Sequence, residues 1–155
     1  MISNNMTYKT VESGIYLAAN SYTQNSADGC TNVVVTGNHV YNAYNNGILC
    51  IGGRQNAIVG NVVQSTANAG INITHVVNTR VCNNTIDSAE LVSHNGIGNN
   101  GDIGGQIAVV GGGNSTTDTG YIATVSGNTM VQSSGVSDRG IYIGADPYPA
   151  AINKV

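Results

Sequence analysis

The chain is poor in several residue types that folded domains commonly use. Its 155 residues include no Trp, no Phe and only two Pro, and charged residues make up 8% of them. Five Lys and Arg against eight Asp and Glu give a formal net charge of −3. Without a basic patch or stripe, nucleic acid is not an expected partner. No apolar run approaches the length of a membrane-spanning helix, so membrane insertion is not expected either.

Cysteine is scarce as well. Cys30, Cys50 and Cys82 are odd in number, which argues against a disulfide framework, and their spacings resemble no metal-ligand set. The glycine-rich run at 111–114 is not followed by Lys-Ser/Thr or by a helical pattern, so it does not predict a phosphate-binding loop. The sequence therefore predicts neither a metal nor a cofactor.

What the chain does contain is internal repetition. One six-residue phrase occurs four times, for example as Val35-Thr36-Gly37-Asn38-His39-Val40. Its fourth residue is always Asn, at positions 38, 61, 84 and 128. A second phrase, Gly-Ile-x-Ile or a close variant, interleaves with it at Gly14, Gly47, Gly70 and Gly140, with a weaker Gly96-Ile97 in between. Two phrases that alternate at a register near 23 residues are typical of a solenoid.

The apolar positions around these phrases keep fixed offsets, three before and two after each repeated Asn. Because side chains alternate between the two faces of a strand, stacked coils turn such offsets into columns that fill one narrow interior. The sequence therefore predicts an all-β fold, a single-stranded right-handed parallel β-helix of about five coils over residues 1–155. The handedness follows the rule for parallel crossovers. An antiparallel meander is the alternative, although it would need no fixed register.

The repeated Asn is expected to turn the chain between two strands, taking the left-handed backbone region and bonding its counterpart one coil away. The preceding Gly37, Gly60 and Gly127 would ease the same corner. Counted back from Gly14, the same register places Asn5 in the ladder. The chain is therefore expected to start in the middle of a coil and to end in the middle of another. The expectation is a segment truncated at both ends from a longer β-helix, or one whose ends are covered by neighbouring chains.

The alternation of a Gly-Ile-x-Ile strand with a Val-x-Gly-Asn-x-Val corner resembles the right-handed parallel β-helix of the pectate-lyase-like superfamily, and phage tailspikes and tail fibres are the nearest in character. The resemblance implies a saccharide-binding face along the Gly-Ile strand and its flanking loops. It also implies a homotrimeric parent protein, located in the virion tail or outside the cell and, if phage-derived, folded in the host cytoplasm. The active-site motifs of polygalacturonases and pectate lyases are missing.

Several side chains beside that face are candidates for acid–base chemistry. Two residues before each strand's Gly the chain has a polar column: Glu12, Asn45, Asn68, His94 and Asp138. Three further acids, Asp87, Glu90 and Asp102, fall in the connections around Gly96. Glycoside hydrolysis uses two carboxyl groups at separations that residues one or two coils apart can reach. The candidate catalytic residues are therefore Asp102, Asp138, His94, Asp87 and Glu90, although all could equally be ordinary solvated surface groups.

The outward side of the Gly-Ile strand carries Tyr16, Leu49, Asn72 and Tyr142. Of these, Tyr16, Asn72 and Tyr142 are the candidate substrate-binding residues. Tyr rings can stack on sugars, but Tyr also simply suits strands. Two functions remain open. One is a depolymerase that binds a bacterial surface polysaccharide and cleaves it as a hydrolase or a lyase. The other is a non-catalytic receptor-binding or structural solenoid, such as an adhesin or a spike shaft.

Overall fold

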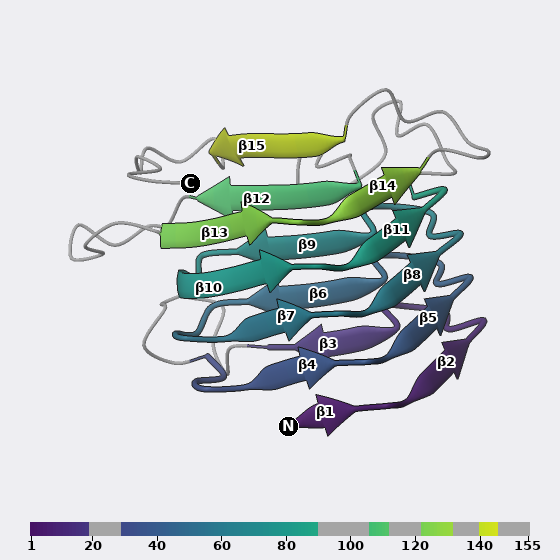
Figure 1. The fold of residues 1–155 in the computed structure, drawn as a ribbon, viewed down its shortest axis with the longest axis horizontal. Coiled ribbons are helices and arrows are strands. Elements are labelled where there is room, and N and C mark those ends of the chain that lie inside the picture. Colours follow the sequence, from purple (N-terminus) through teal and green to yellow (C-terminus); the bar gives the residue numbers. More distant parts are fainter. Residues whose placement is uncertain (19–28, 90–105, 112–121, 132–139, 146–155) are drawn as a thin grey trace.

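The computed structural model describes residues 1–18, 29–89, 106–111, 122–131 and 140–145. Over these ranges the chain winds through five right-handed coils, each built of three short strands, and contains no helix (Figure 1). Neighbouring coils pair only in parallel. The predicted single-stranded, right-handed parallel β-helix is therefore confirmed, and the antiparallel meander is excluded.

The fifteen strands form three parallel sheets, which we call A, B and C, and each coil contributes one strand to every sheet. Sheet A contains β1 (Ile2–Ser3), β4 (Val34–Thr36), β7 (Ala57–Val59), β10 (Val77–Cys82) and β13 (Ile122–Ser126). Sheet B contains β2 (Met6–Tyr8), β5 (His39–Tyr41), β8 (Val62–Gln64), β11 (Thr85–Asp87) and β14 (Thr129–Val131). Sheet C contains β3 (Ile15–Leu17), β6 (Ile48–Ile51), β9 (Ile71–Thr74), β12 (Ile107–Gly111) and β15 (Ile141–Ala145).

The interior is a thin stack of aliphatic columns, one or more from each sheet. The sequence predicted these columns from the fixed offsets, and strand register places their members directly above one another. The central members are fully buried, namely Val35, Ile58 and Val81 in sheet A, Val40, Val63 and Ile86 in sheet B, and Ile48, Ile71 and Ile107 in sheet C. β-Branched side chains suit this space because they fill the pleated surface of a strand without long flexible stems.

Two residues turn the chain from sheet A to sheet B in every coil, and the second of them is the repeated Asn. The expected left-handed conformation belongs to the first residue instead: φ is 57° at Asn4, 64° at Gly37, 67° at Gly60 and 56° at Asn83. The repeated Asn residues have no positive φ. The two corner residues therefore have different roles. The first, a Gly or Asn, makes the bend, and the Asn that follows it forms hydrogen bonds.

These bonds form the ladder that the sequence predicted. The Oδ1 atom of Asn61 accepts two bonds from Asn38, one from its backbone N–H and one from its Nδ2, both at 3.0 Å. The Nδ2 of Asn61 donates to Oδ1 of Asn84 and to the carbonyl of Val35. The same pattern links Asn5 to Asn38 and Asn84 to Asn128. Asn38, Asn61 and Asn84 are each 1% exposed, so the ladder satisfies buried polar groups that could find no water.

In the first three coils, the glycine that precedes the sheet C strand is required by space and not by backbone angle. A Cβ at Gly47 would overlap the side chain of Val63, and one at Gly70 would overlap that of Ile86. The fourth coil departs from the predicted register here, because its sheet C strand begins at Ile107, which pairs with Ile71, and not at Ile97. The position before Ile107 is Gln106, whose carbonyl accepts the Ile71 N–H as the glycine carbonyls do in other coils. The Gly96-Ile97 phrase was therefore a misleading match.

Replacing Asn61 by Ala should destabilise the protein strongly, because the donors of Asn38 and the carbonyl of Val35 would lose their partner while buried. Each buried polar group left unpaired costs about 1–3 kcal/mol, so we expect a loss of roughly 3 kcal/mol or more in the free energy of unfolding measured by urea titration. Asn68→Ala is the matched control, because the Asn68 side chain is half-buried and makes only one bond, from its Nδ2 to Asn45 Oδ1 at 3.3 Å. Equal losses in the two variants would contradict the ladder's role.

Candidate functional site

The predicted binding residues do share one column on the outward side of sheet C. Strand register aligns Tyr16 with Leu49, Leu49 with Asn72, and Asn72 in turn with Ala108 and Tyr142. Tyr16 is 57% exposed and Tyr142 is half-exposed. The sequence missed only Ala108, because the misleading phrase at Gly96 had displaced the strand of the fourth coil. The column thus presents a phenol ring near each end.

The middle of the column differs from its ends. Asn72 is only 5% exposed, and Ala108 is fully buried. The Asn72 amide is already engaged: its Nδ2 donates to Oδ1 of Asn46 at 3.5 Å, and its Oδ1 accepts the Thr74 hydroxyl at 3.0 Å. An alternating sequence pattern gives no sign of this burial, because it separates inward from outward positions but does not show what lies over the outward ones.

Asp87 is the one predicted catalytic residue within the described part of the chain. It ends β11 in sheet B, is half-buried, and accepts a hydrogen bond from the Ser88 hydroxyl at 2.8 Å on Oδ1. Its register neighbours are Gln64 and Val131, so no second described carboxylate lies beside it in the sheet. Asp87 therefore belongs to sheet B, at the corner that leads toward sheet C. The other four, Glu90, His94, Asp102 and Asp138, lie outside the described residues.

The polar column beside the face is partly visible. Asn45 Nδ2 donates to Glu12 Oε2, and Asn68 Nδ2 donates to Asn45 Oδ1, both at 3.3 Å, so these three residues stack as the sequence predicted. His94 was assigned to the same column by counting back from Gly96. Because the fourth strand of sheet C begins at Ile107 instead, that count no longer applies.

Sheet B carries an aromatic cluster that sequence reasoning overlooked. The rings of Tyr8 and Tyr41 stack with centroids 5.5 Å apart and planes 4° from parallel, and the Lys9 ammonium lies 5.2 Å from the Tyr8 centroid. Both Tyr residues are exposed, at 58% and 40%. A signal was available, since each Tyr stands three positions after a ladder Asn, at Asn5 and Asn38.

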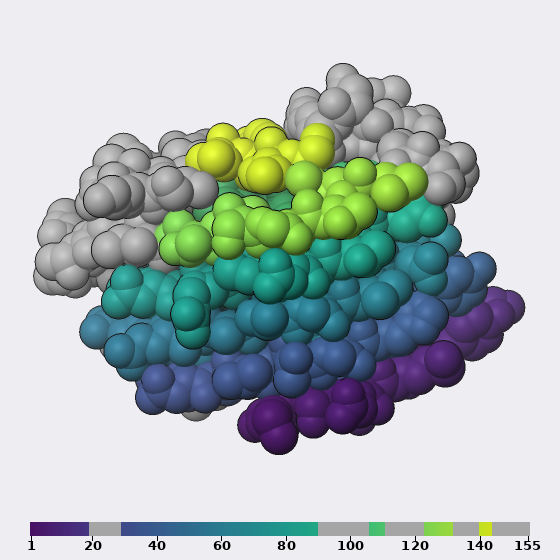
Figure 2. Space-filling view, in the orientation of Figure 1, coloured from purple at the N-terminus to yellow at the C-terminus, as the bar shows by residue number. Residues whose placement is uncertain are grey.

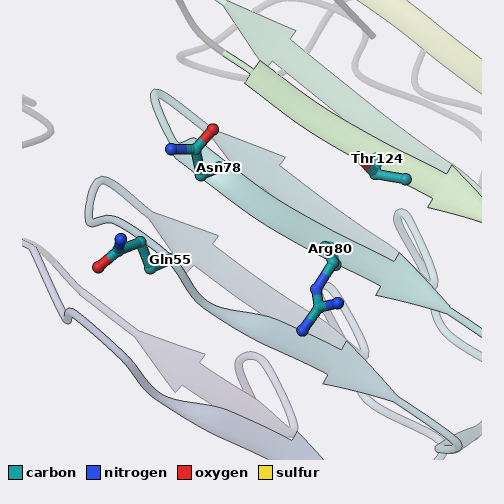
Figure 3. A pocket seen from close by; sticks show the side chains of 4 residues that line it. All are labelled: Gln55, Asn78, Arg80 and Thr124. Atoms are coloured by element: carbon teal, nitrogen blue, oxygen red, sulfur yellow. The ribbon is translucent and has the colours of Figure 1, made fainter.

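A shallow hollow of about 320 Å³ lies on the outward side of sheet A, lined by Gln55, Asn78, Arg80 and Thr124. These residues come from three successive coils (Figure 3). The space-filling view shows this side of the molecule, on which the coils form parallel bands from purple to yellow (Figure 2). Every lining side chain is polar and exposed, and sequence reasoning had assigned none of them a role.

Among the described residues no group of three or more His, Cys, Asp or Glu side chains is arranged to hold a metal ion. The same part of the chain has no helix that is long and apolar enough to cross a membrane. Comparison with protein-family models, with curated proteins and with solved structures finds no match for this chain. The fold is established by the coil geometry.

One buried group has a marked shift in ionisation. Desolvation in the interior raises the pKa of the Cys50 thiol from 9.0 to about 12, with the charge of nearby Cys30 adding to the rise and a hydrogen bond from Asn56 opposing it. A thiol that stays protonated is a poor nucleophile. Cys50 therefore acts as a core side chain, which agrees with its predicted inward position.

We expect a thiol reagent at pH 8 to modify Cys30 and Cys82, which are half-exposed, and to leave Cys50 unmodified until the chain unfolds. Because the pKa of Cys50 is higher in the folded state, its contribution to stability is complete below pH 9 and is lost as the pH rises toward 12. Mass spectrometry after labelling in buffer and in denaturant measures the first effect. Rapid labelling of Cys50 in buffer would show that the interior is open.

Proposed function

We propose that this chain is a saccharide-binding β-helix of a phage-tailspike-like protein, with sheet C and its flanking corners contacting a bacterial surface polysaccharide. The observation that supports the proposal is the distribution of chain length around the coil. The A-to-B corner always has two residues, whereas the connections of variable length, 18–33, 88–106, 112–121 and 132–140, all enter or leave sheet C. Segments that vary on a constant scaffold are where binding and catalysis concentrate.

The column on sheet C adds chemistry to that position. Tyr16 and Tyr142 place two phenol rings on one face, four coil spacings apart in register. With about 4.8 Å between paired strands, the rings are separated by roughly 19 Å, the scale of a short oligosaccharide. A flat aromatic ring offers an apolar surface and a hydroxyl group, which suits the mixed apolar and polar faces of a sugar. The parent protein would be a homotrimer in the virion tail or an extracellular protein.

Cleavage of the bound polysaccharide is the second part of the proposal, and it assigns acid–base roles to Asp87, Glu90, His94, Asp102 and Asp138. All five belong to connections into or out of sheet C or to the strand end that leads there. A pair of carboxyl groups would support hydrolysis. A single base beside a uronate would support elimination instead.

A second candidate function is a non-catalytic receptor-binding or structural solenoid. The burial of Asn72 and Ala108 favours it, because these two central positions of the column present no open polar group to a ligand. In that case sheet C has only a structural role, and the stacked coils act as a spacer.

Tyr16→Ala should weaken binding of the host polysaccharide about tenfold, the scale of one lost aromatic contact. The matched control is Tyr8→Ala, because Tyr8 is 58% exposed against 57% for Tyr16 but lies on sheet B. Isothermal titration of oligosaccharides from the host capsule or lipopolysaccharide into the full-length trimer measures both. Unchanged affinity in Tyr16→Ala, or an equal loss in both variants, would contradict a binding face on sheet C.

Asp102→Asn and, separately, Asp138→Asn should each reduce polysaccharide cleavage by the parent protein about a hundredfold, the usual contribution of a general acid or base. Reducing-sugar release measures hydrolysis, and absorbance of the unsaturated product measures elimination. Glu12→Gln serves as the carboxyl control, and thermal melting confirms that each variant is folded. Cleavage at the wild-type rate in both Asp variants would favour the structural solenoid.

A further inference from the structure

The hollow on sheet A combines side chains that the fold itself does not use. The described part of the chain offers no hydrogen bond or ion pair to the side chains of Gln55, Asn78, Arg80 or Thr124. This contrasts with the ladder Asn residues, whose amides are fully engaged. The hollow is therefore lined by five guanidinium N–H groups, two amides and a hydroxyl, none of which has a hydrogen-bond partner in the described part of the chain.

Strand register explains why these four residues line one hollow. Gln55, just before β7, and Asn78, near the start of β10, hold equivalent positions in successive coils, each with positive φ, 57° and 54°. Arg80 pairs in register with Ala57 below it and Thr124 above it. Because Ala57 has only a methyl group, space remains beside β7, and the Arg80 guanidinium extends toward that strand (Figure 3).

The chemistry of the hollow selects an anion. A guanidinium binds a carboxylate through two parallel hydrogen bonds, in a geometry that an ammonium group cannot reproduce. No acidic side chain is among the lining residues, so none competes for Arg80. The amides and the hydroxyl can both donate and accept, which matches ring hydroxyl groups and not a bare ion. Two coil spacings separate β7 from β13, about 10 Å, a length suited to one or two sugar rings.

We propose that the hollow lined by Gln55, Asn78, Arg80 and Thr124 binds a carboxylate-bearing sugar, a uronic acid residue of an acidic polysaccharide. The sugar part of this assignment rests on the proposed function, whereas anion binding at Arg80 does not. The site lies on sheet A, so it is a contact separate from the column on sheet C.

The direct test is an amide-resolved NMR titration of the chain with three probes: a hexuronate, the neutral hexose of the same configuration, and acetate. We expect the hexuronate to shift the resonances of residues 55, 78, 80 and 124 with a Kd on the order of millimolar, because a single exposed ion pair contributes little by itself. Acetate should bind several-fold more weakly and the hexose not measurably. Added salt should weaken the binding.

Arg80→Gln should raise the Kd for the hexuronate about tenfold, and Arg80→Lys should recover only part of the loss because it restores the charge without the paired donors. Lys9→Gln is the control, because it changes the net charge equally but belongs to the corner after β2. An equal effect of Arg80→Gln and Lys9→Gln would overturn the site.

The remaining outcomes separate the two proposals. If acetate binds as tightly as the hexuronate, the hollow is an unspecific anion site and the assignment to a sugar is wrong. If the hexuronate shifts nothing near residue 80, the whole inference fails. Shifts at Tyr16 and Tyr142 on adding host oligosaccharide report on sheet C independently, so either surface can fail while the other stands.

Discussion

Stacking of one coil on the next is the constraint on which the rest of the structure depends. A coil has too few residues to enclose a core, and only its neighbours make the interior dry. Every coil must therefore keep the same path, and the Asn ladder enforces this, because an Oδ1 atom that accepts two donors from the coil before it leaves little freedom in position. The columns of Ile and Val follow from that register, as do the three sheets.

The same constraint explains what could be predicted from the sequence. Periodic positions such as Ile58 and Val81 are fixed by burial in every coil, so repetition alone reveals them. Gln106 could not be found in this way, because it precedes its sheet C strand where the other coils have a glycine. Its side chain also forms hydrogen bonds that a glycine cannot: it accepts the Ala89 N–H and donates to the Val131 carbonyl. The left-handed residue was assigned one position too late because Asn and Gly both tolerate that conformation. The burial of Asn72 depends on what covers the sheet, which no periodic pattern encodes.

The molecule presents three outward surfaces with different chemistry, although all three are built from the same coil. Sheet B has a stacked aromatic pair, and sheet C has a column that begins and ends in Tyr. Sheet A has the hollow in which Arg80 and its polar neighbours have no hydrogen-bond partner among the described residues. Outward positions are free to vary because stacking requires only that inward ones be kept. A long ligand could therefore touch more than one sheet.

The direction of the hydrogen bonds between coils has a mechanical consequence. These bonds run along the helix axis, so tension along that axis is shared at each interface by the bonds of three sheets and by the ladder together. A force that peels one end of the chain away would instead break these hydrogen bonds one after another and unwind one coil at a time. The protein should therefore resist stretching as a shaft does, while it yields to unzipping from an end.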